Sequence, residues 1–152
     1  MRDITLQTNS PNCGFYNVST KTEAQVGNDP NYDYPYGLVE FSLNCSNATV
    51  TITFPGNVPS TYRKYGPTTP GDPLTTQWYT FANAQINGNQ VTLTLQDGQL
   101  GDDTGIDGII IDQGGPGQQQ QELAVPTMTE WGILVFMVLA GLGSIFYLRK
   151  KA

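Results

Sequence analysis

The stretch Thr49-Val-Thr-Ile-Thr-Phe54 decides the fold class of this chain, because apolar and polar residues alternate along it. Val50, Ile52 and Phe54 fall on one face of an extended strand, and the threonines fall on the other. The stretch Val91-Thr-Leu-Thr-Leu95 repeats the pattern. Antiparallel strands with one buried and one solvated face show this alternation. The two stretches therefore predict half-buried antiparallel strands.

Further strands are predicted where β-branched and aromatic residues lie between clusters of Gly, Pro and Asn. Asn87-Gly88 predicts a two-residue hairpin turn with positive φ at both central positions. Residues 1–112 show no sustained helical period, and the spacing of the strands is that of a β-sandwich. We expect an all-β fold, an antiparallel β-sandwich over residues 1–113. The additional predicted strands cover residues 4–8, 15–20, 38–44, 77–81 and 108–112.

Composition excludes several classes of function. The chain has 152 residues, of which 13% are charged, and it contains no histidine. Without histidine there is no Ser-His-Asp or Cys-His nucleophile and no imidazole metal ligand, so we expect the chain not to be an enzyme. Residues 1–130 hold four basic and thirteen acidic residues, a net charge of −9. So acidic a surface repels phosphate backbones, and we expect no nucleic-acid binding.

A long apolar run follows this acidic part. Residues 131–148 are eighteen consecutive uncharged residues. As a helix they span about 27 Å, close to the hydrocarbon thickness of a bilayer. The alternative is a buried core helix, but such helices usually carry a polar stripe. Arg149, Lys150 and Lys151 follow at once, and basic clusters stay on the cytoplasmic side as a stop-transfer signal. We therefore expect one C-terminal transmembrane helix, a cytoplasmic basic tail and an exported body.

Export needs a signal that the first residues do not supply. The start, Met1-Arg-Asp-Ile-Thr-Leu-Gln, has no apolar core of signal-peptide length. We expect the chain to be the C-terminal part of a longer exported protein, the alternative being that Met1 is not the true start. Residues 114–124 are rich in Gly and Gln, without β-branched or aromatic residues, which predicts a flexible linker before a C-terminal segment at 125–152.

Cys13 and Cys45 are the only cysteines in the sequence. In an exported domain an even count predicts one disulfide, worth roughly 3 to 4 kcal/mol for a loop of this length in the chain-entropy model. Two buried free thiols are the alternative. A metal site on two cysteines without histidine would leave tetrahedral coordination incomplete.

An acidic cluster interleaved with glycine is the one constellation that suggests site chemistry. Carboxylates on tight glycine loops can converge on calcium, which takes oxygen ligands. The EF-hand pattern does not fit, because Gly114 stands where the bidentate glutamate is needed. The other interpretation is that Asp-Gly pairs make turns between strands. The candidate calcium ligands are Asp97, Asp102, Asp103, Asp107 and Asp112.

Five aromatic residues near the middle of the chain admit two interpretations. Tyr62, Tyr65, Trp78, Tyr79 and Phe81 could form a face that stacks on carbohydrate, which would make a surface polysaccharide a partner. In an all-β domain of this size, aromatic residues at alternating positions are more often part of the core.

The end of the chain resembles a known sorting signal. The segment Val125-Pro-Thr-Met-Thr-Glu-Trp-Gly132, followed by the apolar run and the basic tail, resembles the IPTL-CTERM signal. The resemblance implies recognition in the inner membrane of Gram-negative bacteria by an exosortase, a membrane protease that processes the tail. Pro126 keeps the preceding residue out of the helical region, as an extended protease substrate requires. The motif residues are Val125, Pro126, Thr127, Met128, Glu130, Trp131 and Gly132.

A second resemblance covers about residues 50–116. The segments Tyr62-Arg-Lys-Tyr-Gly66, Gly101-Asp-Asp-Thr-Gly105 and Asp107-Gly-Ile-Ile-Ile-Asp-Gln-Gly-Gly-Pro116 resemble the choice-of-anchor U domain, a bacterial surface module. Gln113 stands where that family usually has proline. The family implies placement at the cell surface and no particular activity.

Together these observations predict an exported bacterial surface protein, periplasmic or at the cell surface, that acts by structural or adhesive display. Its helix would lie in the inner membrane before processing by an exosortase-type protease. The alternative is a membrane-tethered glycan-binding or hydrolytic protein whose active domain lies upstream of Met1.

Overall fold

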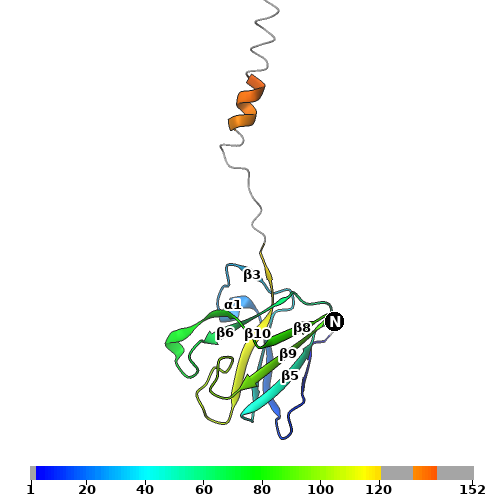
Figure 1. Ribbon diagram of the computed structural model, residues 1–152, viewed down its shortest axis with the longest axis vertical. Coiled ribbons are helices and arrows are strands. Elements are labelled where there is room, and N and C mark those ends of the chain that lie inside the picture. The colour runs from blue at the N-terminus through cyan, green and yellow to red at the C-terminus, as the bar shows by residue number, and fades with distance from the viewer. Residues whose placement is uncertain (1–2, 121–131, 140–152) are drawn as a thin grey trace, which may run out of the picture. The chain divides into compact units, whose positions relative to one another are not determined.

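The computed structural model of the chain describes residues 3–120 and 132–139. Residues up to Gln120 form one unit and those from Gln121 form another, and each is described by itself. The first unit contains two antiparallel sheets and two short helices (Figure 1). The predicted all-β, antiparallel, sandwich-like architecture is confirmed.

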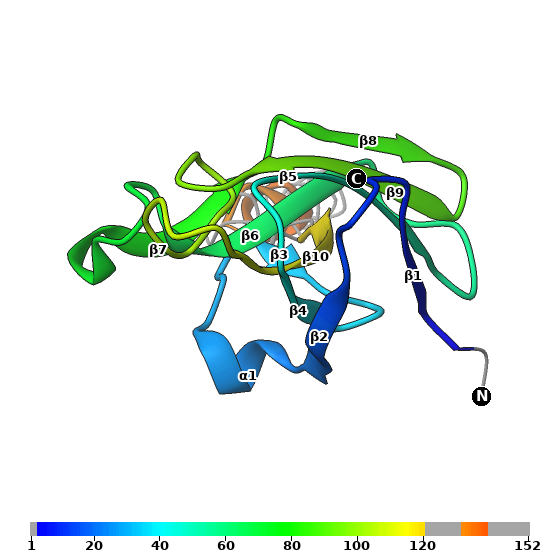
Figure 2. The same ribbon diagram turned by 90° about the horizontal axis from the view of Figure 1, so that it is seen from below.

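The first sheet has the strand order β1-β5-β9-β8, and the second has the order β2-β4-β10-β6-β7, with β3 pairing to the end of β10. Figure 2 shows the sheets as layers, with β5, β8 and β9 on one side and β2 and β4 on the other. The helices are α1 (Glu23–Val26) and the 3-10 helix η1 (Pro73–Thr75). The strands are β1 (Thr5–Thr8), β2 (Phe15–Lys21), β3 (Tyr32–Asp33), β4 (Leu38–Leu43), β5 (Asn47–Thr53), β6 (Thr61–Pro67), β7 (Thr76–Thr80), β8 (Ala84–Asn87), β9 (Gln90–Gln96) and β10 (Ile110–Gln119).

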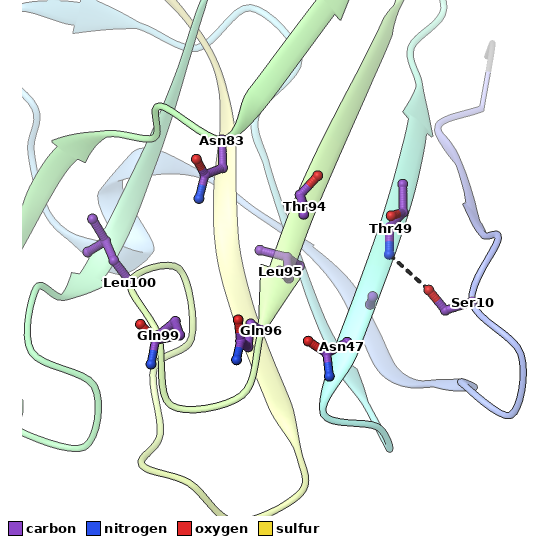
Figure 3. Close-up of a pocket in the computed structure, with 10 residues that line it drawn as sticks. Ser10, Asn47, Thr49, Asn83, Thr94, Leu95, Gln96, Gln99 and Leu100 are labelled. Atoms are coloured by element: carbon purple, nitrogen blue, oxygen red, sulfur yellow. Dashed lines mark hydrogen bonds between the residues drawn. The ribbon is translucent and has the colours of Figure 1, made fainter.

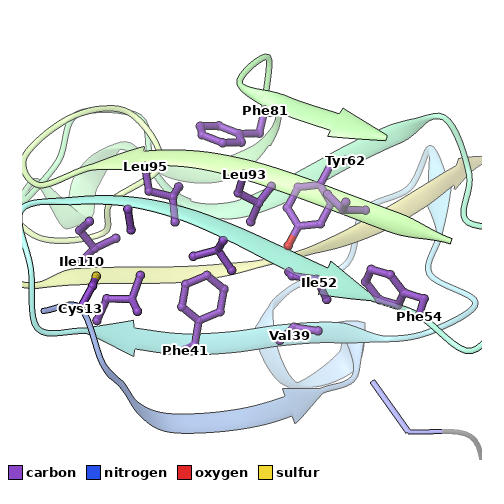
Figure 4. Packing of buried hydrophobic residues seen from close by; sticks show 14 residues of the cluster. Cys13, Val39, Phe41, Ile52, Phe54, Tyr62, Phe81, Leu93, Leu95 and Ile110 are labelled. Atoms are coloured by element: carbon purple, nitrogen blue, oxygen red, sulfur yellow. The ribbon is translucent and has the colours of Figure 1, made fainter. Parts of the chain in front are cut away.

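The core lies between the sheets and follows the predicted alternation. Val50 and Ile52 of β5 are fully buried, whereas the intervening Thr51 is half-buried on the outer face. Phe41 of β4 faces Leu93 of β9 across the sandwich (Figure 4). Each fully buried side chain of this size contributes about 1.5 to 3 kcal/mol, so the alternating stretches supply the main driving force for sheet packing.

The β8–β9 hairpin is confirmed, with its turn one residue later than predicted. Asn87 pairs with Gln90, so the two loop residues are Gly88 and Asn89. Positive φ occurs at Gly88, at +61°, and not at Asn89. A turn with glycine at the first central position needs positive φ only there, which explains the difference.

Cys13 and Cys45 form the predicted disulfide, with their Cα atoms 5.2 Å apart. The bond lies two residues before Phe15 and two residues after Leu43, which pair in the β2–β4 ladder. The N–H of Asn44 also donates to the carbonyl oxygen of Gly14, so the disulfide continues the register of that ladder beyond the Phe15–Leu43 pair.

The linker predicted at residues 114–124 starts inside a strand. Residues 114–119 belong to β10, which lies between β4 and β6 in the second sheet. Gly115 has no room for a side chain, because a Cβ there would lie 2.6 Å from the carbonyl oxygen of Gly37 and 3.0 Å from Leu38. Glycine is thus required by close backbone approach, and a composition typical of linkers here belongs to a buried strand.

In the second unit, residues 132–139 form a helix. No helix among the described residues is long and apolar enough to cross a membrane. The sorting residues 125–131, residues 140–148 of the predicted transmembrane helix, and the basic residues Arg149, Lys150 and Lys151 lie outside the described residues.

Candidate functional site

The loop between β9 and β10 carries four of the five aspartates predicted as calcium ligands. Asp97, directly after β9, accepts hydrogen bonds from the backbone N–H groups of Asp107 at 3.1 Å and Gly108 at 2.8 Å. Asp107 in turn accepts one from the N–H of Ile109 at 2.9 Å. These carboxylates close the turns of the loop.

Asp102 is the centre of the same loop and is fully buried. Its Oδ2 accepts from the N–H of Gly98 at 2.8 Å, and its Oδ1 accepts from the N–H groups of Thr104 at 3.2 Å and Ile111 at 2.9 Å. Charge-assisted bonds of this kind are about twice as strong as neutral ones. Asp102 therefore holds both ends of the loop to β10.

These contacts favour the turn interpretation of the acidic cluster. Among residues 3–120 and 132–139, no three Asp, Glu, Cys or His side chains come together as a metal ion would require. Calcium binding stays a prediction, and the carboxylates of Asp97, Asp102 and Asp107 are already satisfied by backbone donors.

Asp112 has a different environment from the loop aspartates. It lies in β10 on the inner face of the sheet, is fully buried, and contacts Nζ of Lys64 through Oδ2 at 2.6 Å. Lys64, in β6, is also fully buried. Its Nζ donates to the carbonyl oxygen of Gly101 and lies 4.5 Å from the centre of the Phe81 ring. A lysine and an aspartate thus share the interior of the sandwich.

Several polar atoms around this pair have no hydrogen-bond partner among the described residues. They are Asp112 Oδ1, Asp103 Oδ1, and the hydroxyl oxygens of Tyr62 and Tyr79. We call Lys64, Asp112, Asp103, Tyr62 and Tyr79 the interior polar cluster. Unpaired buried polar atoms cost about 1 to 3 kcal/mol each, so their collection at one place requires an explanation.

Burial dominates the electrostatics of the cluster. It raises the pKa of Asp112, although the neighbouring Lys64 acts to lower it. It also raises the pKa of Asp103 to about 7, with Lys64 opposing and Asp112 adding to the effect. The pKa of the Tyr62 hydroxyl is raised by burial and by the charge of Asp112. Because burial penalises the charged forms, the neutral forms of Asp103 and Asp112 are favoured at this site.

The outer face of the second sheet carries an aromatic group. Trp78 stacks on Tyr34, with ring centroids 4.9 Å apart, and packs against Tyr65 at 5.3 Å. The indole N–H of Trp78 donates to the carbonyl oxygen of Gly27 at 2.9 Å. Because Tyr34 lies in the loop that leads to β4, these rings fasten that loop to the sheet. Of the five aromatic residues considered from sequence, Tyr62 and Phe81 are in the core and Tyr79 packs against it, whereas Tyr65 and Trp78 lie outside it.

The outer face of the first sheet is polar and uncharged. A hollow of about 300 Å³ lies there and opens to solvent (Figure 3). Ser10 Oγ accepts a hydrogen bond from the N–H of Thr49 at 3.0 Å at its edge. Hydroxyl and amide groups of this kind bind neutral polar ligands. The side chains around it include Ser10, Asn47, Thr49, Asn83, Thr94 and Gln96.

Lys64 was not anticipated as a site residue. The predicted strands do not include residues 61–67. The stretch Thr61-Tyr-Arg-Lys-Tyr-Gly-Pro67 contains two cations, a glycine and a proline, which weakens its strand signal. Its alternation would have placed Tyr62, Lys64 and Gly66 on one face, and a lysine on a core face is rare unless it is paired. The sequence feature that could have revealed the buried Lys64 is Asp112, an acidic partner at the end of another predicted strand.

Comparison of the chain with family models, with curated proteins and with solved structures gave no match.

Proposed function

We propose that the chain belongs to an exported bacterial surface protein that works by structural or adhesive display, and that an exosortase-type protease sorts it through its C-terminal segment. The observation that carries the proposal is the order of parts along the chain. An acidic β-sandwich precedes a proline-containing motif, an uncharged run of eighteen residues and three basic residues. Motif, apolar segment and basic stop are the parts that a membrane processing enzyme needs in its substrate.

The disulfide supports the exported side of this proposal. Disulfides persist in the periplasm and at cell surfaces and are rare in the cytosol. The Cys13–Cys45 bond joins two neighbouring strands, β2 and β4, by extending their register. Such a bond suits a domain that must stay folded outside the cell, where chaperones cannot rescue it.

The adhesive part of the proposal rests on the polar hollow of the first sheet. Its hydroxyl and amide side chains carry no charge, which favours a neutral polar ligand such as a surface polysaccharide. The same feature favours the binding form of the rival hypothesis, a membrane-tethered glycan-binding protein. Titration of the protein with soluble glycans, followed by NMR shifts of the Asn83 and Gln96 side-chain amides, tests this part. Shifts confined to these groups support it, and unchanged spectra contradict it.

The sorting part is tested in the source bacterium with the full-length gene. Replacement of Pro126 and Trp131 together by Ala should leave the full-length protein in the inner membrane, whereas the unaltered protein reaches the surface. Thr129→Ala is the matched control, because Thr129 lies within the same segment but is not one of the motif residues. Fractionation and surface labelling with an antibody to the sandwich measure the outcome. Surface display of the double variant at the level of the control would contradict the proposal.

A further inference from the structure

The ammonium group of Lys64 and the carboxylate of Asp112 meet where water does not reach. The two side chains are 1% and 0% exposed, and Nζ lies 2.6 Å from Oδ2. Since a C–O bond adds about 1.2 Å, Nζ lies within about 3.9 Å of the carboxyl carbon. Reacting atoms held at 3 to 3.5 Å already have most of the entropic advantage of an intramolecular reaction, so only a small movement separates this contact from attack.

The register of the second sheet brings these two groups together. Lys64 of β6 pairs with Gly114 of β10, and Asp112 lies two residues earlier on β10, on the same face as Gly114. A Cβ at position 114 would lie 3.1 Å from Cγ of Lys64 and 2.9 Å from the ring of Tyr62. The absence of a side chain at Gly114 therefore leaves the space through which the lysine side chain reaches Asp112.

A charged pair in this position is costly. Removing two ions from water costs several kcal/mol each, and their attraction repays that cost only when the remaining hydrogen-bonding capacity is satisfied. Here Oδ1 of Asp112 has no hydrogen-bond partner among the described residues. Passing the shared proton from Nζ to Oδ2 gives an amine and a carboxylic acid, both neutral, side by side. A neutral lysine amine is a nucleophile, and the carboxyl carbon is an electrophile.

A third acid group, Asp103, interacts with both members of the pair. Position 66 lies on the same face of β6 as Lys64. A Cβ at Gly66 would overlap Oδ1 of Asp103, so this oxygen lies directly against the glycine. This oxygen is buried and has no hydrogen-bond partner among the described residues. Asp103 also interacts electrostatically with both Lys64 and Asp112. A carboxyl group placed in this way can take the proton from the attacking nitrogen and give one to the departing oxygen.

We propose that Lys64 and Asp112 join through an amide bond between Nζ and Cγ, with Asp103 as the proton carrier. The lone pair of the neutral amine forms the N–C bond, and a C–O bond of the carboxylic acid breaks. One proton leaves the nitrogen, one proton joins the departing hydroxyl, and one water molecule is released. No oxidant, reductant or activating group is needed, because the step is a condensation.

The bond would link β6 covalently to β10, the last strand of the sandwich before the chain continues to its C-terminal segment. The disulfide links β2 to β4 in the same sheet. Of the three junctions between the adjacent strands β2, β4, β10 and β6, only the β4–β10 junction would then be held by hydrogen bonds alone.

The mass of the full chain after reduction of the disulfide tests the proposal. The expected mass is lower than that of the sequence by one water molecule. Trypsin should not cleave after Lys64, since its amine is acylated. Lys64 and Asp112 should therefore stay in one tryptic peptide, residues 64–149, which should be lighter than its sequence mass by one water molecule. The exposed pair Lys21–Glu40 is the internal control, because its amine and carboxylate are in similar contact, at 2.8 Å, but solvated. Its peptides should remain unlinked.

Asp112→Asn provides a second test that does not depend on loss of the fold. An asparagine at this position would form the same amide bond with release of ammonia, so the variant should reach the same final mass as the linked unaltered protein. Lys64→Arg keeps the positive charge but cannot form the bond, and it should keep the full sequence mass.

Asp103→Asn should slow the linking at least tenfold. Linking of Asp103→Asn at the unaltered rate would overturn the role of Asp103. Recovery of unlinked Lys64 and Asp112 peptides from the folded, unaltered chain would overturn the bond itself.

Discussion

Arg63 donates two hydrogen bonds to one carboxylate oxygen of Asp29, from Nε at 3.0 Å and from Nη2 at 2.9 Å. Asp29 is 1% exposed, and the hydroxyl of Tyr34 donates to the same oxygen at 2.7 Å. The guanidinium also lies over the ring of Tyr32, 4.5 Å from its centre. Through these contacts the loop between α1 and β4 is held on the outer face of the second sheet.

We predict that Asp29→Asn destabilises the protein by about 3 kcal/mol, because it leaves a guanidinium without its buried counter-charge. The matched control is Glu40→Gln, at the Lys21–Glu40 pair, whose side chains are 32% and 28% exposed. An exposed pair contributes less than about 1 kcal/mol. Guanidinium denaturation at neutral pH measures both changes in the free energy of unfolding. Equal losses for the two variants would show that Asp29 does not have the structural role described.

The glycines of β10 give a second prediction. Gly115→Ala should destabilise the protein by about 2 kcal/mol or more, because the added Cβ would lie 2.6 Å from a backbone oxygen that cannot move aside easily. Gly105→Ala is the control, since nothing lies within 4 Å of the Cβ position there. Thermal unfolding of the two variants measures the difference. If the two midpoints agree, residue 115 is not in a packed strand.

The sequence predicted those parts of the fold in which local pattern and tertiary environment agree. The alternation around Val50 and Val91, the hairpin between β8 and β9 and the bond between Cys13 and Cys45 are of this kind. Each depends on a periodicity, a turn preference or a cysteine count that can be read from the sequence without knowledge of tertiary contacts.

The interior polar cluster and the end of β10 could not be predicted in this way. The burial of Lys64 depends on Asp112, 48 residues later, and on the ring of Phe81 beneath its amine. The strand identity of Gly115 depends on backbone atoms of Gly37. A segment rich in glycine shows low strand propensity, and only its neighbours in the sheet reveal that the small residues are needed for close packing.

A pH-dependent prediction follows from the raised pKa of Asp103. Its pKa is about 7 in the folded protein against 3.8 as the reference value, so the folded state binds the proton more tightly than the unfolded state. The contribution of Asp103 to the free energy of unfolding is therefore present at low pH and is lost as the pH rises from about 4 to 7. Asp103→Asn does not titrate and should gain on the order of 2 kcal/mol over the unaltered protein between pH 4 and pH 8. Urea denaturation at both pH values measures this gain, and a constant difference would contradict the buried position of Asp103.

The loop aspartates predict stability that does not depend on calcium. Asp102→Ala should cost about 3 kcal/mol or more, because several backbone donors lose their acceptor in a buried site. The melting temperature of the unaltered protein should be the same in millimolar calcium and in chelator. A ligand at 100 times its dissociation constant adds about 2.7 kcal/mol, so a clear rise in calcium would contradict the turn interpretation and establish the calcium site instead.

The proposed sorting of the protein is tested most directly by the C-terminus of its surface form. Protein released from the surface of the source bacterium should be digested, and its C-terminal peptide should be identified by mass spectrometry. We predict that this peptide ends upstream of the apolar run at residues 131–148. Recovery of an intact C-terminus through Ala152 from the mature surface protein would contradict processing and would make the run a permanent anchor.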